Sequence, residues 1–392
     1  MSKQGSALPL AGVRVVDFSR LLPGPWCTQL LGDLGADVIK VEQPGVGDYS
    51  RYNPPHYQTN SVYFDSVNRN KRSIVLDVAK AEDRAIALKL IDEAAILVES
   101  FRPGVAAKLG IDHESVAKRN PGLIYCSLSG FGAEGELAGM PGHDLSIQGM
   151  TGLLSKHEGP VPAMPGFQAG DYAAAAYAAV GVLAAYVRRQ ETGKGCYLDV
   201  PMYDSLMCWS NILLTGAMAR LAGFSGKPEL EVWGNNPRYN VYPTKDGHAV
   251  TVSLLETRTW ERFCQHIGRP DLMMEEGWHD RHSTHGDRAP LFRKAIADFC
   301  LARERDALVA EMLTAGISIC PVYDADEALV SPEAKTRGVV RQQRYPADGE
   351  VPVLWDPLAR AGLSDPTRRP PPAMGEQSDE IRREVAAKED AR

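Results

Sequence analysis

Short apolar runs alternate with amphipathic stretches through the first half of the chain. Residues 13–18 and 36–42 are rich in β-branched side chains, and the stretch 23–34 between them begins with a proline, as helices often do. Two strands joined by a helix predict a βαβ unit, whose crossover should be right-handed.

The same alternation continues beyond this unit. Strand patterns cover residues 72–77, 95–99, 123–128 and 197–200, and residues 81–93 show the spacing of an amphipathic helix. Strands that alternate with helices predict an α/β fold, in which helices cover a mostly parallel sheet.

An alanine-rich segment, 173–187, is the longest apolar run, and Arg188 and Arg189 follow it. Its length of about 15 residues is short of the ~20 that a membrane span needs, so we predict a buried core helix. Asp171 stands at the start of this helix, where aspartate is a favoured N-cap.

The pattern changes after residue 222. Residues 223–240 are rich in glycine, proline and asparagine, which is typical of a linker between domains. Residues 242–255 predict a hairpin around an Asp-Gly turn. Helical patterns follow to about residue 315, and the last twenty residues predict a charged helix.

Composition excludes several classes of protein. The 392 residues carry 43 Lys and Arg against 50 Asp and Glu, a net charge of -7, so we expect no nucleic-acid partner. Seven scattered cysteines without a Cys-x-x-Cys pair predict neither a disulfide framework nor a zinc site. The N-terminal residues lack the apolar core of a signal peptide. We therefore expect a cytoplasmic protein with no membrane partner.

Basic residues lie beside the predicted strands. Lys71 and Arg72 begin one strand pattern, and Arg102 follows another. Such side chains form charge-assisted hydrogen bonds with phosphate, although charge runs are often only solvated loops. The turn at 22–25 follows the first strand without a Gly-x-Gly-x-x-Gly sequence, so we expect no dinucleotide site of that type.

Histidine and aspartate supply further candidates. The histidine-rich stretch 279–285 matches no recognised metal-ligand spacing, so we expect no metal site there. His143 lies in a Pro-Gly-His-Asp loop. Asp171 is either the N-cap of the alanine-rich helix or a carboxylate that serves as nucleophile or proton carrier, and the residues alone leave both interpretations open.

Several motifs, in the same order along the chain, resemble the class III CoA-transferase (CaiB/BaiF) family. They are LPLAGVRVVDFSRLLPGPWCTQLLGDLGADVIKVEQP at 8–44, NRNKRS at 68–73, ESFRPG at 99–104, Gly-Asp at 170–171, TGKG at 192–195, LDV at 198–200 and GISICPV at 316–322. The similarity runs in register from about residue 8 to 365. This family includes formyl-CoA and carnitine CoA-transferases and the α-methylacyl-CoA racemases.

The resemblance implies a Rossmann-like large domain built from both ends of the chain, 1–222 and 331–392, and a smaller α+β domain, 223–330. It also implies a homodimer whose protomers are threaded through each other like links. CoA or acyl-CoA would bind as a substrate together with a small carboxylic acid, with no tightly bound cofactor and no metal.

The resemblance also assigns CoA contacts to the sheet edge. The pantetheine arm would contact Leu22 and Pro23, the adenine would lie near Leu76, Ser100 and Phe101, and the phosphates would meet Arg102 and Lys108. Gln43 stands at a position that is customarily basic, so residue 43 is not expected to supply that phosphate contact.

Two reactions at Asp171 follow from the resemblance. In the transferases the aspartate at this place attacks the thioester as a nucleophile, forms a mixed anhydride and releases CoA thiolate. In the racemases it moves a proton at the α-carbon, while a histidine backed by a glutamate works on the opposite face. His143 and Glu256 stand at those two positions.

The sequence carries features of both reactions. Residues 233–238 replace the glycine-rich loop of formyl-CoA transferase, which favours a racemase together with His143 and Glu256. Residues 145–149 lack the Asn-Tyr pair of the racemases, and Gln148 suits a transferase. We favour a CoA-transferase, with a racemase as the alternative. A non-catalytic partner subunit would have lost the nucleophile, whereas Asp171 is present.

Overall fold

The computed structural model describes residues 8–156, 161–226, 236–273 and 285–390. The chain forms two compact units. The first comprises Met1–Thr151, Pro165–Trp209 and Pro332–Arg392, and the second comprises Gly152–Met164 and Ser210–Ser331. The division into functional domains at 222 and 330 stays a prediction.

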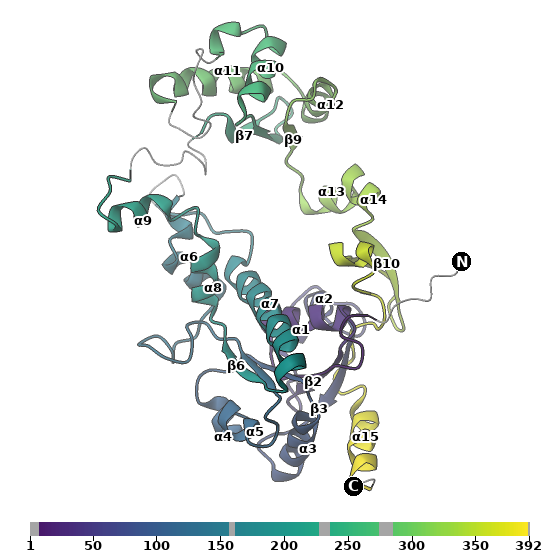
Figure 1. The fold of residues 1–392 in the computed structure, drawn as a ribbon. Coiled ribbons are helices and arrows are strands. Elements are labelled where there is room, and N and C mark those ends of the chain that lie inside the picture. Colours follow the sequence, from purple (N-terminus) through teal and green to yellow (C-terminus); the bar gives the residue numbers. More distant parts are fainter. Residues whose placement is uncertain (1–7, 157–160, 227–235, 274–284, 391–392) are drawn as a thin grey trace. The chain divides into compact units, whose positions relative to one another are not determined.

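A six-stranded parallel sheet forms the centre of the first unit (Figure 1). Its strand order is β3-β2-β1-β4-β5-β6, so the order reverses between β1 and β4, where such sheets bind ligands. The strands are β1 (Arg14–Asp17), β2 (Asp37–Glu42), β3 (Lys71–Val75), β4 (Ile96–Glu99), β5 (Ile124–Ser127) and β6 (Cys196–Asp199). The predicted α/β fold with a Rossmann-like sheet is confirmed.

The central strands carry apolar residues in their middle because helices cover both of their faces. Val15 and Val16 of β1 and Ile96, Leu97 and Val98 of β4 have no exposed surface. The helices of this unit are α1 (Pro23–Asp33), α2 (Val62–Ser66), α3 (Ala81–Asp92), α4 (Val105–Leu109), α5 (His113–Ala117), α6 (Asp144–Met150), α7 (Ala169–Thr192), α8 (Met202–Trp209), α14 (Pro332–Arg337) and α15 (Ser378–Asp390), with 3-10 turns η1 (Tyr49–Tyr52) and η5 (Pro357–Ala361).

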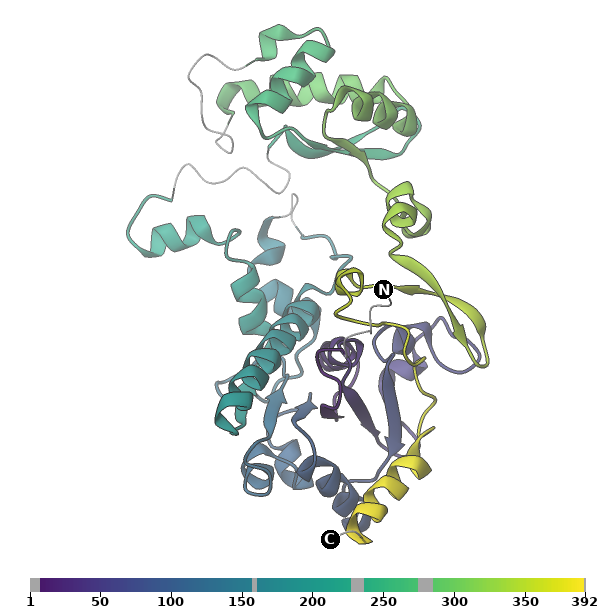
Figure 2. The same cartoon turned by 45° about the vertical axis from the view of Figure 1, so that its right-hand side comes forward.

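The C-terminal part of the chain lies against its beginning within this unit. Helix α15 packs on α3 and β3, as both ribbon views show (Figure 2). The guanidinium of Arg72 on β3 donates to Glu380 at 2.8 Å and Glu384 at 2.6 Å. Before α15, β10 (Val340–Tyr345) and β11 (Gly349–Leu354) form an antiparallel hairpin that the sequence analysis did not predict.

Helix α7 corrects the expectation for Asp171. The helix begins at Ala169, its N-cap is Gln168, and Asp171 lies within its first turn. Asp171 is therefore not the N-cap of this helix. Among the described helices, α7 alone is long and apolar enough to cross a membrane by length and composition. It packs against α1, α6 and α8 within the first unit.

The second unit is an antiparallel sheet with helices. Its three strands, in the order β7-β8-β9, are β7 (Tyr239–Pro243), β8 (Ala249–Ser253) and β9 (Ile319–Pro321). Its helices are α9 (Thr215–Leu221), α10 (Thr257–His266), α11 (Ala289–Leu301), α12 (Arg305–Ala315) and α13 (Ala325–Val330), with 3-10 turns η2 (Leu153–Lys156), η3 (Pro270–Leu272) and η4 (Gly286–Arg288). Trp260, Phe263 and Phe292 form the centre of its core.

The β7–β8 hairpin confirms the predicted Asp-Gly turn, in which Gly247 adopts a φ of 82°. The predicted linker 223–240 ends earlier than expected, because Tyr239 already pairs with Ser253. Half of that linker, residues 227–235, lies outside the described residues. In the histidine-rich stretch only residue 285 is described: His285 is buried, and its ring contacts Asn236 at 3.1 Å.

Buried ion pairs lie beneath the carboxyl ends of β1 and β2. Lys71 Nζ lies 3.0 Å from Asp17 Oδ2, and Lys40 Nζ lies 2.9 Å from Asp48 Oδ2, with all four side chains at most 1% exposed. Burial opposes ionisation of Asp17, but the charges of Lys71 and Lys40 outweigh it and lower its pKa to about 2. Removing one partner of such a pair costs about 3–5 kcal/mol, so these charges hold the surrounding backbone firmly.

Candidate active site

The segments after β1, β4 and β5 border a cavity of about 720 Å³ in the first unit, which we call the main cavity. Parallel sheets place their ligands at this edge. Seven of the residues that the sequence assigns to the site line it: Leu22, Pro23, Ser100, Phe101, Arg102, His143 and Asp171. The fold brings these residues together from positions up to about 150 residues apart in the sequence.

The turn between β1 and α1 is held by side chains from other elements. Leu21 has a φ of 65°, an unusual value for a side chain that branches, and its N–H donates to Asp48 Oδ1 at 3.1 Å. The N–H of Arg20 donates to Ser100 Oγ at 3.0 Å, and Lys40 Nζ donates to the carbonyl of Ser19 at 2.9 Å. This wall of the main cavity is therefore fixed before any ligand arrives.

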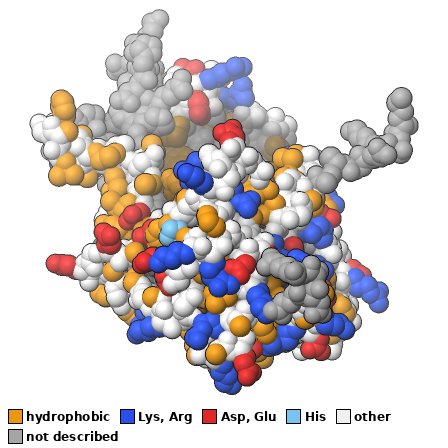
Figure 3. All heavy atoms as spheres, turned by 60° about the horizontal axis from the view of Figure 1, so that its bottom comes forward, with side chains coloured by type: hydrophobic (Ala, Val, Ile, Leu, Met, Phe, Trp, Pro, Cys, Tyr) orange, Lys and Arg blue, Asp and Glu red, His pale blue; other side chains and the backbone are white. Residues whose placement is uncertain are grey.

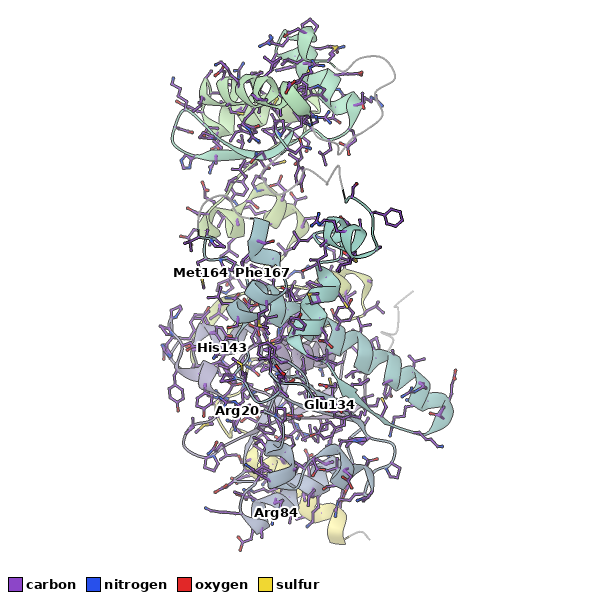
Figure 4. The ribbon with its side chains drawn as sticks, turned by 90° about the vertical axis from the view of Figure 1, so that its left-hand side faces the viewer. Arg20, Arg84, Glu134, His143, Met164 and Phe167 are labelled. Carbon is purple, nitrogen blue, oxygen red and sulfur yellow. The ribbon has the colours of Figure 1, made fainter. Side chains whose placement is uncertain are left out.

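His143 is placed by a close approach of two backbones. Gly142 packs against Gly130, which follows β5, and a Cβ atom on either glycine would overlap the Cα atom of the other. His143 then precedes α6, and its carbonyl accepts the N–H of Ser146 at 3.0 Å. The imidazole is exposed and lines the main cavity. Figure 4 marks the place of His143 in the first unit.

Asp171 meets a second carboxylate at the start of α7. Asp144 Oδ1 accepts the N–H of Gly170 at 2.7 Å and that of Asp171 at 3.4 Å, so Asp144 caps the helix from outside it. Gln148 Nε2 donates to Asp144 Oδ2 at 2.6 Å and to the carbonyl of Phe167 at 2.8 Å. Helix α6 thereby fixes the first turn of α7.

This environment raises the pKa of the Asp171 carboxyl to about 7. Burial is the larger cause, and the negative charge of Asp144 adds to it. A carboxyl that titrates near neutral pH can serve as nucleophile when ionised and as proton carrier in either form. Perturbed groups of this kind concentrate at functional sites.

Aromatic rings complete the surroundings of Asp171. Tyr172 stacks on Phe167 with ring centroids 5.1 Å apart and meets the edge of Trp26 at 5.0 Å. Tyr63 lines the main cavity, and burial, together with the charge of Asp171, raises its pKa above the usual value. Tyr63 therefore keeps its proton at neutral pH and remains a hydrogen-bond donor.

Three predicted site residues lie elsewhere. Leu76 lines a smaller cavity of about 300 Å³ with Gln43 and Phe101, which we call the minor cavity. Lys108 is exposed on α4 and does not line either cavity. Glu256 is exposed at the start of α10 in the second unit, and its part in the site stays a prediction.

The structure corrects the assignment of Lys71 and Arg72 to phosphate. Lys71 is fully buried, and its three ammonium hydrogens are used by Asp17, Asn68 Oδ1 and the carbonyl of Pro25. Arg72 Nη2 lies 2.8 Å from Asp37 Oδ2, and its Nη1 donates to the glutamates of α15. Both cations serve internal ion pairs, and their hydrogen-bond donors are taken by groups of the protein itself.

Sequence reasoning missed Asp144 and Tyr63. Asp144 directly follows His143, but no periodicity shows that its carboxylate reaches a helix more than twenty residues later. Tyr63 belongs to α2, a five-residue helix too short to leave a pattern. Both depend on tertiary packing.

Known proteins match this chain over nearly its whole length. A family model described as CoA-transferase family III matches residues 10–378. The acetyl-CoA:oxalate CoA-transferase of Acetobacter aceti is 33% identical, with 97% of each chain covered. The human succinyl-CoA:glutarate CoA-transferase is 29% identical over 99% of this chain and 89% of its own. The crystal structure of a CaiB/BaiF family protein from Brucella suis superposes with a TM-score of 0.80 at 30% identity, covering 97% of this chain and all of that chain.

Asp171→Asn should stabilise the protein in a pH-dependent way. Because the folded-state pKa is raised from 3.8 to about 7, the wild type loses stability as the pH rises through this window, and the variant does not. We expect the variant to gain about 1–3 kcal/mol at pH 8 and nothing near pH 3.5, less than the full shift because the carboxyl is partly exposed. Urea unfolding across this pH range measures the difference.

Asp379→Asn is the matched control, since Asp379 is exposed in the first turn of α15. A stability difference between the wild type and Asp171→Asn that stays constant from pH 4 to pH 8 would contradict the raised pKa.

Proposed function

The chain belongs to CoA-transferase family III, and we propose that it transfers CoA between an acyl-CoA thioester and a small carboxylic acid. The observation that carries the proposal is the partly buried Asp171 carboxyl at the wall of the main cavity. Relatives that match almost the full chain are named as CoA-transferases, which supports the same class of reaction here.

Asp171 would act as the nucleophile of the first half-reaction. Its ionised carboxylate attacks the thioester carbonyl carbon, the carbon–sulfur bond breaks, and CoA leaves as a thiolate. The acyl group remains on Asp171 as a mixed anhydride. The thiolate then attacks the aspartyl carbonyl carbon, which releases the donor acid and leaves an aspartyl thioester.

The second half-reaction runs the same steps in reverse with the acceptor acid. The acceptor carboxylate attacks the aspartyl thioester and displaces the thiolate, giving a new anhydride. The thiolate then attacks the acceptor's acyl carbon, so the new acyl-CoA leaves and the Asp171 carboxylate is restored. No net proton is gained or lost, and no group besides the two substrates is consumed.

Other residues of the main cavity would assist these steps. The protonated hydroxyl of Tyr63 is a candidate donor to the oxygen that becomes negatively charged in each acyl transfer. The fixed turn at Leu22 and Pro23 would hold the pantetheine arm, since rigid walls lower the entropy lost on binding. In a transferase His143 would polarise or shape the site.

One observation favours the racemase alternative. His143 lines the same cavity as Asp171, so two groups that can carry a proton share one site. In a racemase these two groups would remove and return the α-proton on opposite faces of the substrate. The two reactions differ in what they exchange: a transferase exchanges CoA between carboxylic acids, and a racemase exchanges the α-proton.

A dual exchange assay tests the proposal. The enzyme is incubated with several acyl-CoAs and free acids in deuterated water, and both CoA exchange and α-deuterium uptake are followed. We expect the wild type to exchange CoA without deuterium uptake. CoA exchange should be lost in Asp171→Asn, and its rate should fall less than about tenfold in His143→Ala. General acid–base catalysis by His143 would instead be worth about 10²–10⁴-fold.

His56→Ala is the matched control for His143, since His56 is exposed and lies outside the main cavity. The racemase would be selected if the wild type takes up deuterium without exchanging CoA, and if the rate of deuterium uptake falls at least about 10²-fold in His143→Ala.

We further propose that the protein is a homodimer with interlocked protomers. Tyr177, Val180 and Val187 on α7 are 41%, 63% and 65% exposed, and their spacing places them on one face of the helix. Exposed apolar faces mark interaction surfaces, and a second copy of the chain would cover this one. We expect this dimer to act in the cytoplasm, with CoA as a substrate and no tightly bound cofactor.

Light scattering tests the assembly. An interlocked dimer has twice the 42.7 kDa of the chain and does not dissociate on dilution, because separating the protomers requires unfolding. A compact particle of monomer mass at nanomolar to micromolar concentration would contradict the proposal.

A further inference from the structure

We propose that Arg20 binds the diphosphate of CoA at the place where the main cavity meets the minor cavity. This inference rests on the proposed function. Neither the family resemblance nor the basic loops of the sequence pointed to Arg20. Its position, its charge and its neighbours point to this role.

Arg20 lies at the junction of the two cavities. It lines the main cavity with Leu22 and Asp171, and it lines the minor cavity with Leu76 and Gln43. Phe101 and Val105 also line both, so these three residues lie where the two cavities meet. A ligand that fills both cavities would therefore pass beside Arg20.

The Arg20 guanidinium contacts aromatic rings and an amide, and these contacts leave its positive charge unpaired. Its Cζ atom lies 5.6 Å from the centre of the Tyr49 ring and 5.7 Å from that of Phe101, both within the range of cation–π contacts. Its Nη2 reaches Gln43 Oε1 only at 3.5 Å. Within the part of the chain that the structure describes, no carboxylate forms an ion pair with Arg20.

Three other arginines of the first unit are already engaged. Arg51 pairs with Glu42 at 2.7 Å, Arg69 with Asp33 at 2.7 Å and Arg72 with Asp37 at 2.8 Å. Figure 3 shows one face of the molecule, over which basic and acidic side chains are interspersed. Arg20 has no such carboxylate partner among the described residues, and its guanidinium offers planar, bidentate hydrogen bonding to a phosphate.

Hydrogen bonds hold the backbone at Arg20. Its own N–H is held by Ser100 Oγ, and the next N–H, of Leu21, is held by Asp48. The side chain therefore starts from a fixed backbone, which reduces the entropy lost when it binds a phosphate.

The two cavities suggest which part of CoA meets Arg20. The main cavity contains the Asp171 carboxyl and so takes the thioester arm. The minor cavity is lined by apolar Val41, Leu76 and Val78, which suit the face of a purine. In CoA the diphosphate connects these two parts, so it falls at the junction.

Binding measurements with two ligands test the assignment. Calorimetry gives the Kd of CoA and of 3′-dephospho-CoA for the wild type, Arg20→Ala and Arg20→Lys. We expect Arg20→Ala to raise both Kd values about 10- to 100-fold, as charge-assisted hydrogen bonds do, and to raise them equally. Arg20→Lys should recover part of the loss, because it keeps the charge without the bidentate geometry.

Arg84→Ala is the matched control. It removes the same charge from α3, lines neither cavity, and lies well away from Arg20 in Figure 4. We expect its Kd values to match those of the wild type. Melting temperatures of all variants exclude a loss of folding, since the Arg20 side chain is partly exposed.

The outcomes are distinct. A loss for CoA with none for 3′-dephospho-CoA would move Arg20 to the 3′-phosphate and overturn the assignment. Unchanged Kd values, or an equal loss in Arg84→Ala, would also overturn it. A wild type that binds neither ligand would instead contradict the proposed function, which keeps the two failures apart.

Discussion

The buried ion pairs Lys40–Asp48 and Lys71–Asp17 are the constraint on which the site depends. Four charges without exposed surface are tolerable only when each is paired and hydrogen-bonded, so their positions are fixed closely. Asp48 also accepts the N–H of Leu21, and Lys40 also donates to the carbonyl of Ser19, so the same two residues hold the turn after β1, in which Leu21 has a positive φ. The wall of the main cavity is therefore set by electrostatics beneath the sheet edge, and a ligand adds little to its order.

The opposite wall depends on a carboxylate pair. Asp144 caps α7 from α6, which orients the first turn and places a negative charge beside Asp171. This contact holds the helical turn that carries Asp171, and the charge of Asp144 adds to the burial that raises the pKa of the Asp171 carboxyl. The main cavity therefore joins a rigid binding wall to a carboxyl with raised pKa, and both acyl transfer and proton transfer could use this combination. The chemistry is decided by the substrate atoms that reach Asp171.

Much of the sheet could be predicted from the sequence, because its buried strands are apolar runs and the helices between them are periodic. The strand patterns near 13–18, 36–42, 95–99 and 123–128 correspond to β1, β2, β4 and β5. The site was harder to predict. Seven of the assigned residues line the main cavity, whereas Lys71 and Arg72 pair with carboxylates inside the fold. The sequence does not show these pairs, because the partners Asp17 and Glu384 lie far away along the chain. Sequence patterns show where charges stand but not which charges pair.

Trapping the acyl group on Asp171 tests the proposed nucleophile directly. Wild-type enzyme is mixed with an acyl-CoA and then with hydroxylamine, which converts an aspartyl anhydride or thioester into a hydroxamate. Peptide mass spectrometry then locates the modified residue. We expect a hydroxamate on Asp171, and none on Asp144 or in the Asp171→Asn variant. An enzyme that exchanges CoA at full rate yet leaves Asp171 unmodified under these conditions would contradict the central claim.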